Sequence, residues 1–210
     1  MKYFSRLSFV LIFIIVFTFI SVSPSNAVAQ DKNSVVTEHF DNRYTFWGGY
    51  SAQSVRFLGK TRNSQTQILR IGFQKYIKEL NNGFSLWYSA GIIPYLHFDY
   101  PKRDANDRRT TSNGFGFSPA GFLVKKYHSK WITPFTQTTG GIILMDEYFP
   151  TDKGRKLNFT FDITVGNIFT LNSFSDLSLG YKFHHISNAQ TGSENPGLDS
   201  NFLFLTLSFH

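Results

Sequence analysis

The feature that most constrains the fold is an alternation of apolar and polar residues that recurs from Tyr44 to the end of the chain. In residues 176–187 the odd positions include Leu177 and Leu179, whereas the even positions include Asp176 and Lys182. Successive side chains of a β-strand point to opposite faces, so a period of two predicts strands. Less regular or shorter segments of this kind lie at about 44–57, 69–73, 84–98, 114–126, 131–145, 158–165 and 203–209. The sequence therefore predicts about eight strands.

The polar faces of these strands carry charged residues that need water or one another. They are Arg70, Asp162, Asp176 and Lys182. The opposite faces are rich in Phe, which supplies 24 of the 210 residues. A soluble sandwich or a lipocalin-like barrel also alternates, but it buries its apolar face. Strand length and the Phe-rich rows favour an all-β fold, an eight-stranded antiparallel transmembrane β-barrel with a polar lumen.

The alternation also assigns faces to residues of two further strands. In residues 84–98, all the even positions from Phe84 to Phe98 are expected on one apolar face. In the last strand, Asp199 has the same parity as Leu203, Leu205 and Leu207, so its carboxylate is expected on the outer face with them.

The connections between the expected strands alternate in length. Short ones are expected at 78–83, 127–130 and 171–174, and longer ones at 58–64, 99–113, 146–156 and 188–198. In outer-membrane barrels the longer loops are extracellular. This places the end of the 176–187 strand, and the loop after it, at the outer leaflet.

Residues 1–29 have the pattern of a secretory signal peptide, which leaves 30–210 as the barrel domain. Lys2 and Arg6 precede an apolar run from Leu7 to Ile20, and Ala27-Val28-Ala29 fits a cleavage site. A membrane anchor is the alternative, but a run of about 14 residues is shorter than the roughly 20 that a spanning helix needs.

Composition excludes several classes of site. The chain has no Cys, which excludes a disulfide scaffold, a thiolate metal site and a Cys nucleophile. No metal-ligand spacing links the histidines, and no cofactor is expected. The formal net charge is +7, and +5 without Lys2 and Arg6 (7 − 2). For an exported protein, anionic lipid headgroups are a better partner for this charge than nucleic acid.

Three catalytic residue types are expected together at the carboxyl end. His185 and Ser187 share a strand face with Cα atoms roughly 6.5 Å apart, and Asp199 begins the next strand on the same side. A serine nucleophile needs a base and a group that orients the base, which His185 and Asp199 can supply. His184 points the other way, into the lumen. Asn188 follows the serine and could donate an N–H to an oxyanion.

The segment His185-Ile-Ser187-Asn188-Ala189, with an acid twelve residues after the serine in Asn195-Pro-Gly-Leu-Asp199, resembles the lipid A 3-O-deacylase (PagL) family of Gram-negative outer membranes. The resemblance implies an eight-stranded barrel with Ser187 as nucleophile, His185 as base, Asp199 as acid and Asn188 as oxyanion donor. The family typically carries Glu at the acid position, so Glu194 stays open as an alternative acid.

The implied function is a serine esterase that removes the ester-linked 3-O-acyl chain of lipid A, the lipid anchor of lipopolysaccharide. An outer-membrane phospholipase and a non-enzymatic barrel serving adhesion or envelope integrity are the alternatives. Candidate headgroup-binding residues in one basic loop are Lys102, Arg103, Arg108 and Arg109. A homodimer is a possible assembly.

Overall fold

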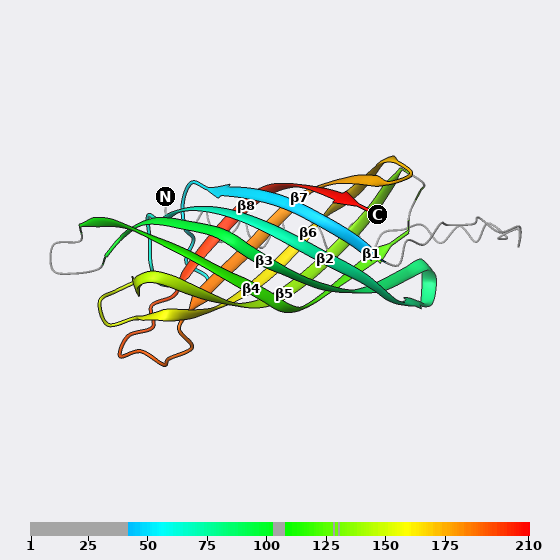
Figure 1. Ribbon diagram of the computed structural model, residues 1–210. Coiled ribbons are helices and arrows are strands. Elements are labelled where there is room, and N and C mark those ends of the chain that lie inside the picture. The colour runs from blue at the N-terminus through cyan, green and yellow to red at the C-terminus, as the bar shows by residue number, and fades with distance from the viewer. Residues whose placement is uncertain (1–41, 103–107, 128, 130) are drawn as a thin grey trace, which may run out of the picture. The chain divides into compact units, whose positions relative to one another are not determined.

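Eight antiparallel strands pair in chain order and close into a barrel, with β1 hydrogen-bonded to β8 (Figure 1). The computed structural model describes residues 42–102, 108–127, 129 and 131–210, so the predicted signal peptide lies outside the described residues. The strands are β1 (Asn42–Ser51), β2 (Gln65–Leu80), β3 (Phe84–Pro101), β4 (Arg109–Lys126), β5 (Ile132–Phe149), β6 (Arg155–Asn172), β7 (Ser175–Ser187) and β8 (Leu198–Phe209). A short 3-10 turn, η1 (Asn81–Gly83), joins β2 to β3. The predicted fold class is confirmed.

The two faces of the strands have the predicted orientation. Arg70, Asp162 and Lys182 are each at most 4% exposed inside the barrel. Leu203 and Leu205, which alternate with buried residues of β8, are 85% and 54% exposed on the outside. An apolar outer wall around a polar interior is the arrangement that a lipid bilayer requires of a barrel.

Inside the lumen, several polar side chains bond to one another. His184 lies 2.5 Å from Asp162, Nδ1 to Oδ1, and Thr139 donates its hydroxyl to the other carboxylate oxygen at 2.7 Å. Lys182 completes this cluster at 3.6 Å from Asp162. Arg43 pairs with Asp176 further along the lumen. His184 therefore belongs to the interior, as its parity predicts.

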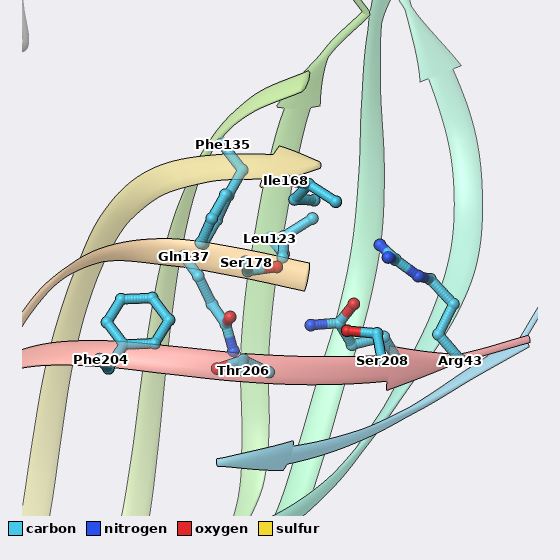
Figure 2. Close-up of a pocket in the computed structure, with 10 residues that line it drawn as sticks. Arg43, Leu123, Phe135, Gln137, Ile168, Ser178, Phe204, Thr206 and Ser208 are labelled. Carbon is cyan, nitrogen blue, oxygen red and sulfur yellow. The ribbon is translucent and has the colours of Figure 1, made fainter. Parts of the chain in front are cut away.

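A cavity of about 20 Å³ remains in the lumen, near the start of β1 and the end of β8. Figure 2 shows side chains from several strands converging on it, among them Gln137, Ser178 and Thr206. Such a volume has room for about one water molecule. The lumen here is a packed core, and the candidate catalytic residues do not line this cavity.

The prediction for one face of residues 84–98 is wrong in its second half. Ile92 is 52% exposed, as expected, but Leu96 and Phe98 are fully buried. β3 carries an extra residue around Pro94 relative to both β2 and β4, which is a β-bulge. Pro cannot donate to a ladder and is tolerated at bulges, and the extra residue reverses the parity beyond it.

Several strand ends also differ from the predicted ones. β1 ends at Ser51 instead of about residue 57, and the strands from β3 to β6 continue into the segments expected as outer loops. Paired polar side chains support these extensions: Asp146 at the end of β5 accepts hydrogen bonds from Ser112 and Asn113 of β4.

The four connections β1–β2, β3–β4, β5–β6 and β7–β8 meet at one end of the barrel, on the left in Figure 1. Within the part of the chain that is described, no helix has the length and apolar character needed to cross a bilayer.

Candidate active site

His185 and Asp199 face each other across the β7–β8 pair. The two residues are direct partners in the strand register, and His185 Nδ1 lies 2.6 Å from Asp199 Oδ1. Only Ile186 and Ser187 on β7, and Leu198 on β8, lie between this pair and the loop of residues 188–197. Asp199 therefore reaches His185 in spite of its short side chain, because the register places the two Cα atoms opposite each other.

Ser187 is the last residue of β7 and shares the outer face with His185. In the pairing of β7 with β6, Ser187 lies opposite Phe159 and His185 lies opposite Phe161. Both phenylalanines are exposed, at 36% and 41%, so the serine lies at the edge of an apolar outer wall, where β7 meets the β7–β8 loop. Because Nδ1 of His185 is engaged by Asp199, Nε2 is the ring nitrogen left for another partner.

The β1–β2 loop, residues 52–64, covers Asp199 from outside. The backbone N–H groups of Phe57, Leu58 and Gly59 donate to Asp199 Oδ2 at 2.9, 2.7 and 2.7 Å. The side chain of Asp199 is consequently 0% exposed although its strand parity is outward, whereas that of His185 is 15% exposed. Three N–H donors on one carboxylate oxygen stabilise its ionised form. Sequence reasoning missed this contact, since it extended β1 through residue 57.

A family model for lipid A 3-O-deacylase (PagL) matches residues 46–208, which is most of the chain and includes His185, Ser187 and Asp199. The chain belongs to the PagL family. With its closed barrel and apolar exterior, it is an outer-membrane β-barrel protein.

Solved structures show the same fold. A crystal structure of the outer-membrane enzyme PagL has a TM-score of 0.53 and 20% sequence identity, covering 78% of this chain and 97% of that one. A crystal structure of Neisserial surface protein A has a TM-score of 0.50 and 10% identity, covering 80% and 96%. No curated protein sequence matches the chain significantly.

Glu194, the alternative acid in this PagL-family chain, points elsewhere. Its carboxylate lies 3.3 Å from Lys153 Nζ, and its backbone N–H donates to the Lys153 carbonyl at 3.1 Å. These contacts tie the β7–β8 loop to the β5–β6 loop. The structure thus brings Asp199, and not Glu194, to His185.

Asn188 is fully buried and holds the β7–β8 loop together. Its backbone N–H donates to Asn195 Oδ1 at 3.0 Å, and its side-chain Nδ2 donates to the Glu194 carbonyl at 2.7 Å. Its own carbonyl accepts from Thr191. The hydrogen bond that Asn195 Oδ1 accepts from Asn188 N–H is a second contact that sequence reasoning missed, because the run Asn195-Pro-Gly is typical of an ordinary turn.

Three of the candidate headgroup residues lie at the ends of β3 and β4: Lys102 follows β3, Arg108 precedes β4 and Arg109 begins it. Lys102 pairs with Asp152 at 2.7 Å, and Arg109 pairs with Asp99 at 2.9 Å. Arg108 is exposed, and Arg103 lies outside the described residues. Arg109 Nη1 also donates to the Asn63 carbonyl at 2.8 Å, which connects this basic segment to the β1–β2 loop.

Proposed function

We propose that the protein is an outer-membrane serine esterase that removes the ester-linked 3-O-acyl chain of lipid A. The observation that carries the proposal is the 2.6 Å contact between His185 and Asp199 on the outer face that also bears Ser187, in a chain of the PagL family. A hydrolytic site on the outer wall selects a substrate that resides in the membrane, because the surrounding surface is apolar.

In the first half of the reaction, Ser187 Oγ attacks the ester carbonyl and forms a bond to its carbon while its proton passes to His185 Nε2. Asp199 accepts the His185 Nδ1–H, which keeps the imidazole in the tautomer with a basic Nε2 and stabilises the imidazolium that forms. The tetrahedral intermediate then expels the sugar oxygen, which takes the proton from His185. The products of this half are the 3-hydroxyl of lipid A and an acyl group on Ser187.

In the second half, water adds to the acyl carbonyl with His185 as base, and the fatty acid leaves as the Ser187 hydroxyl is restored. The oxyanion of each tetrahedral intermediate needs N–H donors. We assign this role to Asn188. Its backbone N–H and one Nδ2 hydrogen are used inside the loop, so the second Nδ2 hydrogen is the donor that we assign to the oxyanion.

The substrate would lie with its acyl chains along the outer wall and its phosphates at the loops. Phe159 and Phe161 line the wall beside Ser187 and His185 and offer apolar contact to the chain being removed. We assign headgroup contacts to the β3–β4 segment of Lys102, Arg103, Arg108 and Arg109. Lys102 and Arg109 already pair with acids, so replacement of Arg108 should raise KM more than replacement of either.

Mass spectrometry of lipid A from Gram-negative cells that express the protein tests the proposal. Expression of the wild-type chain should remove one 3-linked acyl chain, and a Ser187→Ala variant present at the same level in the outer membrane should leave lipid A unchanged. Loss of the acyl chain with the Ser187→Ala variant would contradict the assigned mechanism. Purified protein assayed on lipid A and on phospholipids separates a deacylase from a phospholipase, and inactivity on both would indicate a non-enzymatic barrel.

A further inference from the structure

The β1–β2 loop, residues 52–64, does more than connect two strands, because it folds back over β7 and β8, which carry the candidate site. Its residues 57–59 supply three consecutive N–H donors to a single oxygen of Asp199, at 2.7–2.9 Å. Asp199 uses its other oxygen for His185. The carboxylate is thus held from two sides, by the base it orients and by the backbone of a distant segment.

Further contacts dock the loop onto the strand that carries the acid. Val55 N–H donates to the backbone carbonyl of Asp199 at 3.1 Å, and Lys60 N–H and Thr61 N–H donate to the carbonyls of Pro196 and Gly197 at 2.6 and 3.2 Å. These bonds flank residues 57–59 on both sides. The three donors are therefore fixed in position by the same strand and loop that position the carboxylate.

The outer end of the loop also packs on β7. The ring of Phe57 meets that of Phe183 edge to face, with centroids 5.7 Å apart, and Phe183 is 4% exposed although its parity is outward. Phe57 and Leu58 themselves are 69% and 51% exposed. The loop thus replaces lipid with protein over the outer face of β7 and β8 at this level.

An ionised carboxylate on the lipid-facing wall of a barrel is unfavourable unless other groups hydrogen-bond it. Without the loop, Asp199 would face lipid with one hydrogen bond, from His185. The exposed carboxylate could then rotate toward water or bind a proton, and in both cases it would no longer orient His185. The loop removes both alternatives.

We infer that the β1–β2 loop is a positioning element of the hydrolytic site, and that its residues 57–59 keep Asp199 charged and aligned with His185. The inference rests on the proposed function. None of these three residues touches the substrate ester in the proposed reaction; they act through Asp199. The loop therefore contributes to the rate of the chemical step and not to substrate binding.

Gly59 is the residue on which this arrangement depends most. A Cβ at this position would lie 2.8 Å from the Leu198 nitrogen and 2.9 Å from the Gly197 carbonyl carbon, and both are backbone atoms. Gly59→Ala must therefore push the loop away from β8. A displacement of about 1 Å in a positioned catalytic group lowers the rate by up to about 100-fold. We expect kcat of Gly59→Ala to fall about 10- to 100-fold with KM within about twofold of wild type.

Gly140→Ala is the matched control for this substitution. A Cβ there would lie 3.9 Å from the nearest atom, the Thr160 carbonyl oxygen, so the same chemical change meets no obstacle. Its kcat should equal that of wild type. A second pair tests the docking bonds directly. Lys60→Pro removes the N–H that donates to Pro196, whereas Lys60→Ala keeps it, so kcat should fall in the first and hold in the second.

The assay measures release of the 3-linked fatty acid from lipid A by purified protein in detergent, together with the rate of labelling by a lipophilic serine-reactive phosphonate. Heat-modifiable electrophoretic mobility reports that each barrel is folded. Slower labelling of folded Gly59→Ala and Lys60→Pro would support the inference, because the probe reports activation of Ser187 and not headgroup binding. If Gly59→Ala does not fold, the Lys60 pair decides.

Wild-type kcat in folded Gly59→Ala or in folded Lys60→Pro would overturn the inference. A rise in KM at constant kcat would overturn it as well, since it would make the loop a substrate-binding element. If Ser187→Ala is inactive in the same experiment, the proposed function stands in either case. Activity in Ser187→Ala would instead refute the proposed function itself.

Discussion

Replacement of Asp199 by Asn tests the assignment of the acid with little change in shape. In the wild-type site, Asp199 Oδ2 accepts three backbone N–H groups, from residues 57–59, and Oδ1 accepts from His185 Nδ1. An Asn side chain can satisfy the three donors only with its carbonyl oxygen. Its NH2 group must then face His185.

This orientation inverts the hydrogen bond to the base. With an NH2 group opposite it, His185 Nδ1 must accept a hydrogen bond, so the proton moves to Nε2. Nε2 can then no longer act as the base that we assign to Ser187. In serine proteases the equivalent change from Asp to Asn leaves the geometry intact and lowers kcat about 10,000-fold. We expect a similar loss for Asp199→Asn, equivalent to about 5.5 kcal/mol of transition-state stabilisation.

The measurement is kcat for fatty-acid release from lipid A, with Glu194→Gln as the matched control. Glu194 makes an exposed pair with Lys153, so its neutralisation should change kcat by less than about threefold. Retention of more than a tenth of the wild-type kcat by folded Asp199→Asn would show that Asp199 is not the orienting acid. An equal loss in Glu194→Gln would point to the other acid.

Three further predictions concern the acid, the lumen and a close contact between two strands. Asp199→Glu should lower kcat at least about tenfold, because the added methylene displaces either the imidazole or the three N–H donors. Asp162→Ala should lower the free energy of unfolding by about 3–5 kcal/mol, since it leaves buried charges unpaired, whereas Asp152→Ala, in an exposed pair, should change it by less than about 1 kcal/mol. Gly166→Ala places a Cβ 2.3 Å from the Leu179 carbonyl oxygen and should lower the free energy of unfolding by about 1–3 kcal/mol, whereas Gly140→Ala should not change it. Urea unfolding in detergent micelles measures the stability of the Asp162, Asp152 and glycine variants, and fatty-acid release measures kcat of Asp199→Glu.

Strand parity predicted the parts of the site that lie on regular ladders. His185 and Asp199 share the outer face, and Lys182 and His184 share the lumen with Asp162, because β6, β7 and β8 pair without a register shift through these residues. Each side chain there follows from its odd or even position alone. The fold class, the number of strands and the outward orientation of His185 and Asp199 could therefore be predicted from the sequence.

The same rule failed in β3, where Pro94 lies at a bulge. Beyond it, Leu96 and Phe98 point inward. The even positions of the sequence stay apolar through the bulge, so the alternation itself shows no sign of the change. Proline inside a long strand was the available signal, because proline removes a ladder donor and is found at bulges or edges.

The cover of Asp199 could not be predicted from parity at all. Parity states which way a strand residue points, and loop residues have no parity. The contact between Gly59 and Asp199 joins residues 140 positions apart, and it depends on the path of the loop after Ser51. A run of Phe57-Leu58-Gly59 within a polar, basic segment is a weak sign that the loop packs on something apolar.

The covering loop also accounts for a short acid at this position of a PagL-family chain. An acid directly opposite His185 in the ladder must reach its ring nitrogen and still find partners for its second oxygen. Asp199 does both because the loop brings its N–H groups inward to the carboxylate, closely enough that Gly59 has no room for a side chain. A longer acid would carry its carboxylate further from β8, into the volume that residues 57–59 occupy. Acid length and loop position are therefore one structural feature of this site, and a change in either should require a change in the other.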